Sequence, residues 1–222
     1  MDYNPQEPLI SIHIPKAGGS AFAEILKLWF RRNLHLHYYN EVKNKLPKQL
    51  NFSKLKPNTC IHGHFNKVRG FGIEQYYPSC KQFITILRDP LEIQISKFNY
   101  RMMLHKKNLL YYQGLKESQN ITDIDEYLES TEPNILLHFP KELTMENYRE
   151  ILDSHFVHLG ILENLSTTIE IISEKLNQTP IIPDKINVTS TKVVPSKSIA
   201  TKFKDKYKLE YAIYEYAKSI NS

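Results

Sequence analysis

Two short segments of this chain hold the side chains best suited to binding a phosphate-like anion. The first is Leu9 to Phe22, LISIHIPKAGGSAF, in which an apolar run leads into Lys16, Gly18, Gly19 and Ser20. Glycines let the backbone approach a ligand closely, and N–H groups at the start of a helix point toward an anion. We expect Lys16 to reach the ligand from the strand side and Ser20 to cap the helix. The order of strand, turn and helix predicts an anion cradle.

The second segment is Phe83 to Tyr100, FITILRDPLEIQISKFNY, which predicts a strand, an arginine and a helix in that order. Asp89 and Pro90 suit the N-cap and first turn of the helix that follows Arg88. Ser96 lies on this helix toward the end nearest Arg88, so a guanidinium and a hydroxyl are placed to hold one phosphate. An ion pair between Arg88 and Asp89 and a solvated serine are the structural alternatives. The predicted core-facing positions are Leu91, Ile95, Phe98 and Met102.

The position of the lysine distinguishes the first segment from the nucleotide-triphosphate loop GxxxxGK[ST]. In that loop the lysine follows the glycines and stands beside a hydroxyl that holds magnesium. Here Lys16 precedes the glycines, and the sequence has no GK[ST]. This order favours anion binding without an obligatory metal and disfavours the alternative of a nucleotide or small-molecule kinase. Taken alone, the segment is also compatible with an ordinary strand-to-helix turn.

Together, HIPKAGGS and LRDPLEIQISKF resemble the two cofactor motifs of the sulfotransferases, the 5′-phosphosulfate loop and the 3′-phosphate motif. The resemblance implies that 3′-phosphoadenosine 5′-phosphosulfate is the sulfuryl donor and that no metal is needed. The donor-binding residues that it implies are Lys16, Ala17, Gly18, Gly19, Ser20, Arg88 and Ser96.

Further segments extend this resemblance, and HIPKxGG is similar to the carbohydrate branch, the relatives of heparan sulfate and uronyl 2-O-sulfotransferases. Residues 61–65, IHGHF, resemble the segment with the catalytic histidine of the uronyl enzymes. Residues 159–165 resemble a strand-to-helix block of the family. Residues 187–189 resemble a late loop that closes over the nucleotide, and nearby Lys192 is a further candidate phosphate contact, with a plain surface loop as the alternative.

Sulfuryl transfer calls for a cation at the leaving phosphate and a base at the acceptor hydroxyl. Lys16 is the candidate cation. Histidine titrates near neutrality and therefore suits the role of the base. The resemblance makes His64 the first candidate, because it stands at the glycine-histidine position of the family, and His62 is the second, which we place on the opposite face of an extended segment. Two histidines at this spacing can also ligate zinc, but no third ligand or cysteine pattern completes such a site, so no metal is predicted.

The acceptor is less defined than the donor. A hydroxyl on a glycan is the predicted acceptor, and uronic acid, hexosamine, lipid-linked glycan and protein tyrosine stay open. Residues 66–79 and 104–119 are the loops in which we expect acceptor selectivity. Tyrosine pairs offer faces for sugar rings, with packing as the alternative; they are Tyr38 and Tyr39, Tyr76 and Tyr77, and Tyr111 and Tyr112. A non-enzymatic alternative is an anion-binding module that keeps the nucleotide loop without catalysis.

Strands alternate with helices along the chain, which predicts a P-loop-like three-layer α/β/α fold with a central, mostly parallel sheet. The expected strands are Leu9 to Ile14, His35 to Tyr39, Thr59 to His64, Gln82 to Leu87 and Phe156 to Ile161. The expected helices are Ser20 to Arg32, Pro90 to Lys106, Ile121 to Glu129, Thr144 to Asp153, Leu165 to Leu176, and Lys197 to Ile220 with a break near Asp205. Ligands collect at the carboxyl ends of such strands, where Lys16, the histidines and Arg88 fall.

Composition agrees with one enzyme domain over residues 1–222, since 41% of the residues are hydrophobic and no repeat or linker divides them. The N-terminal MDYNPQEPLI lacks the features of a leader, and no apolar run reaches the length of a membrane span, so we expect a cytoplasmic protein. Cys60 and Cys80 are then expected to be buried free thiols. The net charge of +5 fits a protein that handles anions. Nucleic acid is the rival partner, but zinc-finger and RNA-recognition patterns are absent.

Overall fold

The structure is a computed structural model that describes residues 1–107, 122–132, 135–181 and 193–222. Its centre is a five-stranded sheet in the order β2-β3-β1-β4-β5. All four pairings between neighbouring strands are parallel. The strands are β1 (Leu9–Ile12), β2 (Leu34–His37), β3 (Cys60–Gly63), β4 (Gln82–Leu87) and β5 (Phe156–Ile161).

Helices connect the strands and cover the sheet. They are α1 (Gly19–Phe30), α2 (Ile73–Tyr76), α3 (Pro90–Lys106), α4 (Ile124–Ser130), α5 (Tyr148–His155), α6 (Leu165–Lys175), α7 (Lys197–Lys206) and α8 (Lys208–Ser219). Short 3-10 helices span Arg31–Asn33, Phe52–Lys54, Ile135–His138 and Leu162–Asn164. The described part of the chain contains no helix with the length and apolarity to cross a bilayer.

Burial of the strands explains their composition. Every residue of β1, β3, β4 and β5 is buried, as expected for a parallel sheet covered on both faces. Strand β2 lies at the edge and exposes Leu36. The near-continuous apolar runs that predicted β1 and β4 therefore reflect helices packed on both faces.

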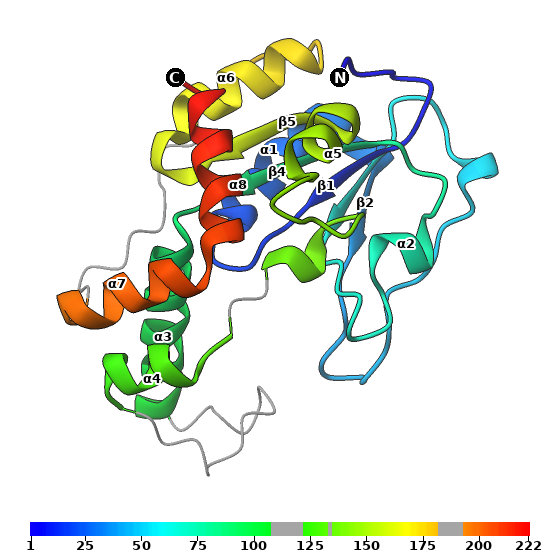
Figure 1. The fold of residues 1–222 in the computed structure, drawn as a ribbon. Coiled ribbons are helices and arrows are strands. Elements are labelled where there is room, and N and C mark those ends of the chain that lie inside the picture. Colours follow the sequence, from blue (N-terminus) through cyan, green and yellow to red (C-terminus); the bar gives the residue numbers. More distant parts are fainter. Residues whose placement is uncertain (108–121, 133–134, 182–192) are drawn as a thin grey trace.

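The helices form two layers, one on each face of the sheet. In Figure 1, α5 and α8 lie in front of the sheet and α1 lies behind it. The rear core joins α1 and α6 to the sheet, with Phe22, Leu26 and Trp29 from α1 packed against residues such as Ile84. The front core joins the sheet to α5 and α8. The predicted three-layer α/β/α fold is confirmed, and its sheet is parallel throughout.

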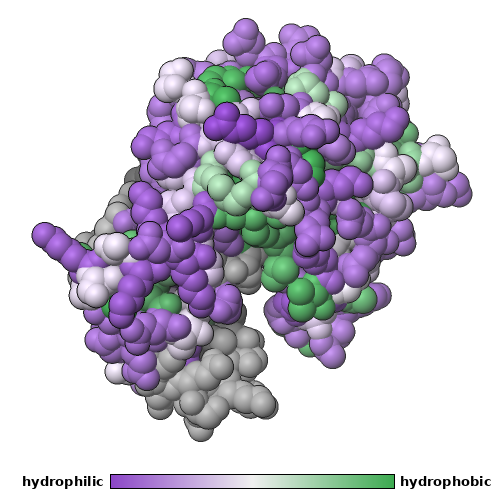
Figure 2. Space-filling view, viewed as in Figure 1, coloured by the Kyte–Doolittle hydropathy of each residue, from purple (hydrophilic) through white to green (hydrophobic). Residues whose placement is uncertain are grey.

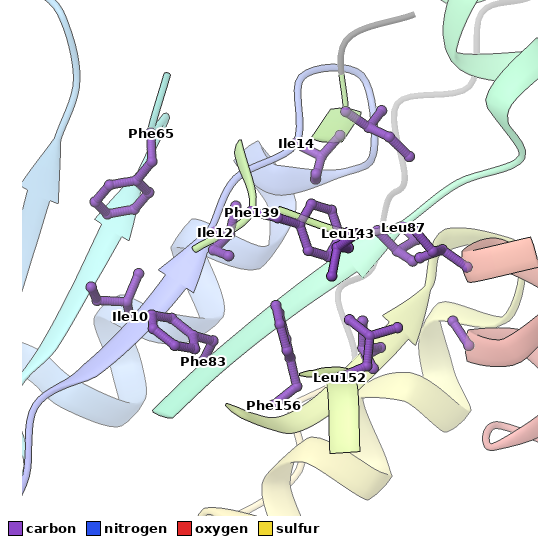
Figure 3. Packing of buried hydrophobic residues seen from close by; sticks show 14 of the residues in the cluster. Ile10, Ile12, Ile14, Phe65, Phe83, Leu87, Phe139, Leu143, Leu152 and Phe156 are labelled. Atoms are coloured by element: carbon purple, nitrogen blue, oxygen red, sulfur yellow. The ribbon is translucent and has the colours of Figure 1, made fainter. Parts of the chain in front are cut away.

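Figure 3 shows the packing of the front core. Ile10 and Ile12 of β1, Phe83 of β4 and Phe156 of β5 point toward the layer that includes Leu152 of α5. Leucine and aromatic side chains from the segment before α5 fill the remaining space, namely Phe139 and Leu143. This core holds β1, β3 and β4 in fixed register, so their carboxyl ends form one continuous edge.

A third apolar cluster lies to the side of the sheet and joins α3, α4 and α7. Ile95 and Phe98 of α3 are buried in it, while Leu91 and Met102 are packed against it, which confirms the predicted core-facing positions of α3. Helix α8 takes part as well, because its Tyr211 belongs to this cluster and its Ile213 belongs to the front core. The last helix therefore contacts both hydrophobic units.

Two of the differences between predicted and observed helix boundaries have a local cause. The expected break near Asp205 lies at Tyr207, where the backbone leaves helical geometry and α8 begins. The helix predicted from Thr144 starts at Tyr148, because the Thr144 N–H donates to Asn147 Oδ1 at 2.7 Å and closes a turn ahead of the helix. Both differences arise from local turns that hydrophobic spacing does not reveal.

The face of the molecule seen in Figure 1 is predominantly polar. Figure 2 shows this face as mostly hydrophilic, with hydrophobic residues near the centre of the view and in smaller areas elsewhere. Cys60 and Cys80 are free thiols in the interior, as predicted. Burial raises the pKa of the Cys80 thiol to about 12, so it is protonated and unreactive at neutral pH.

Candidate functional site

Three segments that follow neighbouring strands meet at one edge of the sheet. Lys16 follows β1, His64 follows β3 and Arg88 follows β4, and these strands are adjacent and parallel. Parallel strands place their carboxyl ends at the same edge, where loops have room to bind a ligand. The structure thus brings together the three residues that the sequence analysis placed there.

The backbone between β1 and α1 has the shape of an anion cradle. Lys16 and Gly18 both adopt positive φ, 71° and 77°, and such reversals turn successive N–H groups toward a common point. A side chain on Gly18 would be strained by this φ and would lie 2.5 Å from Cδ1 of Leu162. Helix α1 then begins at Gly19, where the first helical N–H groups have no partner within the helix. The loop Lys16 to Gly19, with buried Ala17 inside it, is suited to an anion.

The expectation that Ser20 caps α1 is wrong. Gly18 occupies the N-cap in left-handed geometry, and no side chain caps this helix. Ser20 is the second helical residue and is exposed. The glycine pair itself supplies the sharp entry into the helix, so a serine cap is not needed there. The Ser20 hydroxyl remains available beside the cradle.

Lys16 and Arg88 lie close together beside the cradle. Arg88 Nη1 donates to the Lys16 carbonyl oxygen at 3.1 Å, and Arg88 Nη2 contacts Glu92 Oε2 at 3.0 Å. Lys16 Nζ lies 4.5 Å from the ring centroid of Tyr100 on α3. Burial, assisted by the nearby Arg88, lowers the pKa of Lys16. Two cations held this near each other favour an anion between them.

Ser96 lies on the face of α3 that borders these cations. Glu92, Ser96 and Tyr100 follow one another at intervals of four residues, so they form one row along the helix. Because Glu92 contacts Arg88 and Tyr100 contacts Lys16, the row passes the pair of cations, and half-buried Ser96 stands in its middle. Arg88 pairs with Glu92, and Asp89 is instead the N-cap of α3 that accepts from Leu91 N–H at 2.8 Å.

Glu163 is a positioning residue to which the sequence analysis gave no role. Its Oε1 accepts a hydrogen bond from the Asp89 N–H at 3.0 Å and so fixes the turn that carries Arg88. Glu163 stands in the 3-10 helix after β5, within the predicted strand-to-helix block of residues 159–165. The contact joins segments 74 positions apart, and only the sheet order reveals it.

A cluster of four histidines, His13, His62, His64 and His138, lies at the same edge of the sheet. The ring centroids of His13 and His64 are 4.3 Å apart, those of His13 and His62 are 5.4 Å apart, and those of His64 and His138 are 6.4 Å apart. Tyr38 lies against the cluster and its hydroxyl is 2.9 Å from His13 Nδ1. His13 and His138 were not predicted as site residues. The position of His13 within the HIPK motif could have predicted its place in the site. His138 reaches the site only through the tertiary fold, so no local pattern predicts it.

His62 and His64 differ in what surrounds them. The prediction that they point to opposite faces is wrong, because residues two apart in an extended chain share a face, and both rings contact His13. His62 is fully buried, with Nδ1 2.9 Å from the Ser11 hydroxyl. His64 lines a cavity instead. Nε2 is buried without a hydrogen-bond partner in both rings, among the groups that the structure describes.

Burial keeps the clustered imidazoles neutral. Desolvation, with smaller contributions from the neighbouring histidines, lowers the pKa of His13 to about 2 and that of His62 to about 3. Burial and nearby Arg69 lower the pKa of His64 to about 4, and burial and His64 lower that of His138 to about 4. At neutral pH each of these rings has a lone pair that can accept a proton.

A cavity of about 300 Å³ opens beside His64 and next to the cradle. Its walls include Pro15, the neighbour of Lys16, and the aromatic residues Tyr38, Tyr39 and Phe71. Arg69 also lines it, with its guanidinium 4.1 Å from the Tyr39 ring centroid and 3.3 Å from Glu41 Oε1. Aromatic faces beside charged groups suit a small polar ring with hydroxyls. The loop of residues 66–79 contributes to this cavity, as expected for selectivity.

The remaining predicted positions lie away from this cavity or outside the described residues. Tyr77 is buried in the front core, and Tyr76 packs against that core. Lys192, the loop of residues 187–189, and Tyr111 and Tyr112 lie outside the described residues. Within the ranges that the structure does describe, no group of three or more His, Cys, Asp or Glu side chains is arranged to hold a metal ion.

No protein-family model and no curated protein matches this sequence. Among solved structures, the mouse sulfotransferase SULT7A1 complexed with PAP aligns with a TM-score of 0.47 and 14% sequence identity over 92% of this chain and 64% of that chain. This chain therefore corresponds to less than two thirds of the length of that protein. A function has to be inferred from the site itself.

Proposed function

We propose that this protein is a sulfotransferase that moves a sulfuryl group from 3′-phosphoadenosine 5′-phosphosulfate to a hydroxyl. The observation that carries the proposal is that two features lie next to each other at one sheet edge: an anion cradle lined by cations, and a neutral histidine. The cradle is Lys16 to Gly19 with Arg88 beside it, and the histidine is His64. The two sets of residues fit the two ends of a sulfuryl transfer.

The donor fits the cradle by charge and by shape. Its 5′-phosphosulfate suits the backbone N–H groups of Gly18, Gly19 and Ser20 at the turn that positive φ at Lys16 and Gly18 creates, whereas the Ala17 N–H already donates to the Ile14 carbonyl oxygen. Its 3′-phosphate suits Arg88 and Ser96, where a guanidinium stands beside a row of α3 residues. Binding would exchange the contact of Arg88 with Glu92 for one with phosphate. Lys192 stays a candidate for a further phosphate contact.

The residues present can also perform the transfer. The acceptor hydroxyl gives its proton to the unprotonated ring nitrogen of His64 as its oxygen forms a bond to sulfur. The bond from sulfur to the bridging oxygen breaks, and the negative charge that develops on the leaving phosphate faces Lys16. Because His64 lines the cavity and His62 is sealed between Ser11 and His13, we assign the base to His64.

A carbohydrate is the acceptor that we propose. The cavity beside His64 has the volume to take about one sugar ring, and Tyr38, Tyr39 and Phe71 provide aromatic walls. Arg69 and Glu41 supply polar contacts for hydroxyls at its rim. We also propose a cytoplasmic location and a single catalytic domain over residues 1–222.

Calorimetry with 3′-phosphoadenosine 5′-phosphate tests the donor site directly. We expect saturable binding in the absence of magnesium, and transfer of labelled sulfuryl groups to at least one member of a panel of polysaccharides and glycolipids. Absence of binding would refute the proposal. Binding without transfer to any acceptor would instead support an anion-binding module, and magnesium-dependent turnover of ATP would support a kinase.

A further inference from the structure

His13 is the residue of this site that neither the cradle nor the candidate base accounts for. It is the first residue after β1, and its N–H donates to the Gly63 carbonyl oxygen at 2.8 Å, which ties it to the end of β3. One edge of its ring fills the space that a side chain on Gly19 would occupy. The other side faces His64, 4.3 Å away between ring centroids. His13 therefore stands between the cradle and the base.

Tyr38 contacts one of the two ring nitrogens of His13. The Tyr38 hydroxyl lies 2.9 Å from His13 Nδ1. Burial raises the pKa of Tyr38, so the phenol keeps its proton, and it can donate to an unprotonated Nδ1 or accept from an Nδ1–H group. A neutral imidazole that accepts at Nδ1 has its own N–H at Nε2. Nε2 belongs to the edge of the ring beside Gly19, at the start of α1.

No hydrogen bond to Nε2 of His13 is found among the residues that the structure describes. Because this nitrogen lies beside Gly19, at the start of α1, an N–H on it would suit an anionic oxygen bound at the cradle.

We propose that His13, oriented by Tyr38, donates a hydrogen bond from Nε2 to an oxygen of the sulfuryl group during its transfer. The assignment rests on the proposed function. His13 neither gains nor loses a proton in this role, while the acceptor proton still goes to His64. A fixed neutral donor holds the sulfuryl oxygens in place as the bonds to sulfur exchange, without adding charge beside the base. Burial and the surrounding histidines hold the pKa of His13 to about 2, which keeps the ring neutral.

Nitrogen-resolved NMR of the histidine rings in the full-length protein tests this role without an activity assay. We expect the Nε2–H tautomer of His13 in the free protein and a mixture of tautomers in Tyr38→Phe. The Nε2 resonance should shift when 3′-phosphoadenosine 5′-phosphosulfate is added, and less with 3′-phosphoadenosine 5′-phosphate, which lacks the sulfuryl group. His155, which precedes β5 at the opposite edge of the sheet, serves as the internal control.

Three outcomes overturn the assignment. An Nδ1–H tautomer in the free protein contradicts the orientation by Tyr38. A His13 resonance that ignores bound donor contradicts the contact while leaving the donor proposal intact. Lack of binding of either nucleotide refutes the donor proposal, and this assignment falls with it.

Kinetics of matched variants provide the second readout. His13→Phe keeps a ring over Gly19 but removes both nitrogens, so we expect kcat to fall about tenfold to a hundredfold with the Kd for 3′-phosphoadenosine 5′-phosphate nearly unchanged. His13→Gln retains an N–H donor and should recover part of kcat, and His155→Gln should match the parent. Equal losses in His13→Phe and His13→Gln would mean that the ring has a packing role alone. If His13→Phe fails to fold, Tyr38→Phe tests the same donor.

Discussion

The cradle and the histidine cluster lie at one sheet edge and have opposite electrostatics. Lys16 and Arg88 put two cations side by side at the cradle. At the cluster, burial is the main cause that holds His13, His62 and His64 neutral, assisted by other histidines for the first two and by Arg69 for His64. The two cations of the cradle would stabilise a negatively charged ligand. The buried histidines of the cluster disfavour protonation, so they stay neutral in the absence of a proton donor. Burial lowers the pKa in both regions, but the ordinary value is 10.5 for Lys16 and 6.5 for the histidines, so the histidines are the groups that it keeps neutral at pH 7.

We expect the largest effect on kcat from a substitution in the histidine cluster. His64→Ala removes the proposed base and should lower kcat by about 10²-fold to 10⁴-fold, with donor affinity retained. His62→Ala opens a cavity in a packed region and leaves the Ser11 hydroxyl without its partner, so its main effect should be a lower Tm. Steady-state kinetics and thermal melting of both variants separate these roles. A larger kcat loss in His62→Ala, with Tm unchanged, would move the base to His62.

At the cradle, we expect one substitution to act mainly on turnover and another to act mainly on donor affinity. Lys16→Ala should lower kcat by about 10²-fold because the leaving phosphate loses its cation, while donor affinity falls less. Arg88→Ala should mainly raise the Kd for 3′-phosphoadenosine 5′-phosphate, by about tenfold or more, since it removes a charged hydrogen bond. Lys27→Ala is the control, because Lys27 is an exposed lysine on α1 that pairs with Glu24. Equal effects of Lys16→Ala and Arg88→Ala on kcat and Kd would contradict this division.

The smallest effect that we predict is a dependence of stability on pH. In the unfolded chain histidine binds a proton near pH 6.5, whereas folded His64 does so only near pH 4. Between these values the unfolded state binds more protons, so stability falls as the pH drops from 7 to 4.5. We expect the contribution of His64 to the free energy of unfolding, taken as the difference between the parent and His64→Gln in urea titrations, to be lower by about 2 kcal/mol at pH 4.5 than at pH 7.

A control is needed because Glu210 acts in the opposite direction. Burial raises its pKa to about 7, so its contribution to stability is greatest at low pH and declines as the pH rises through 7. His64→Gln should flatten the predicted dependence, and Glu210→Gln should steepen it. A slope that His64→Gln leaves unchanged would show that His64 is not held neutral by the fold.

Local sequence order was sufficient to predict the cradle. Lys16, Gly18 and Gly19 stand in one loop, and Arg88 follows the end of an evident strand, so periodicity and turn residues placed them correctly. The parallel sheet followed from the alternation of strands and helices. Ser20 was misassigned as a cap because glycine geometry, which sequence pattern does not show, already determines the start of α1.

Contacts that join distant segments were beyond sequence reasoning. Glu163 supports the turn of Arg88, and His138 joins the histidine cluster from a segment more than 60 positions beyond His64. Each depends on which strands are neighbours and on how the front core packs. The neutrality of the cluster likewise follows from burial, which a list of histidines does not reveal.

Helix α8 supplies no residue to the site and yet bears on all of it. Its Tyr211 packs with α3, whose row of residues borders Arg88, and its Ile213 packs on the sheet that carries Lys16 and His64. Beyond the helix, Asn221 Nδ2 donates to the Leu159 carbonyl oxygen of β5 at 2.7 Å. We therefore expect substitutions on the inner face of α8 to change the distance between the two proposed phosphate sites while every proposed ligand-binding residue stays the same. In directed evolution this helix is a place to adjust nucleotide preference at a distance.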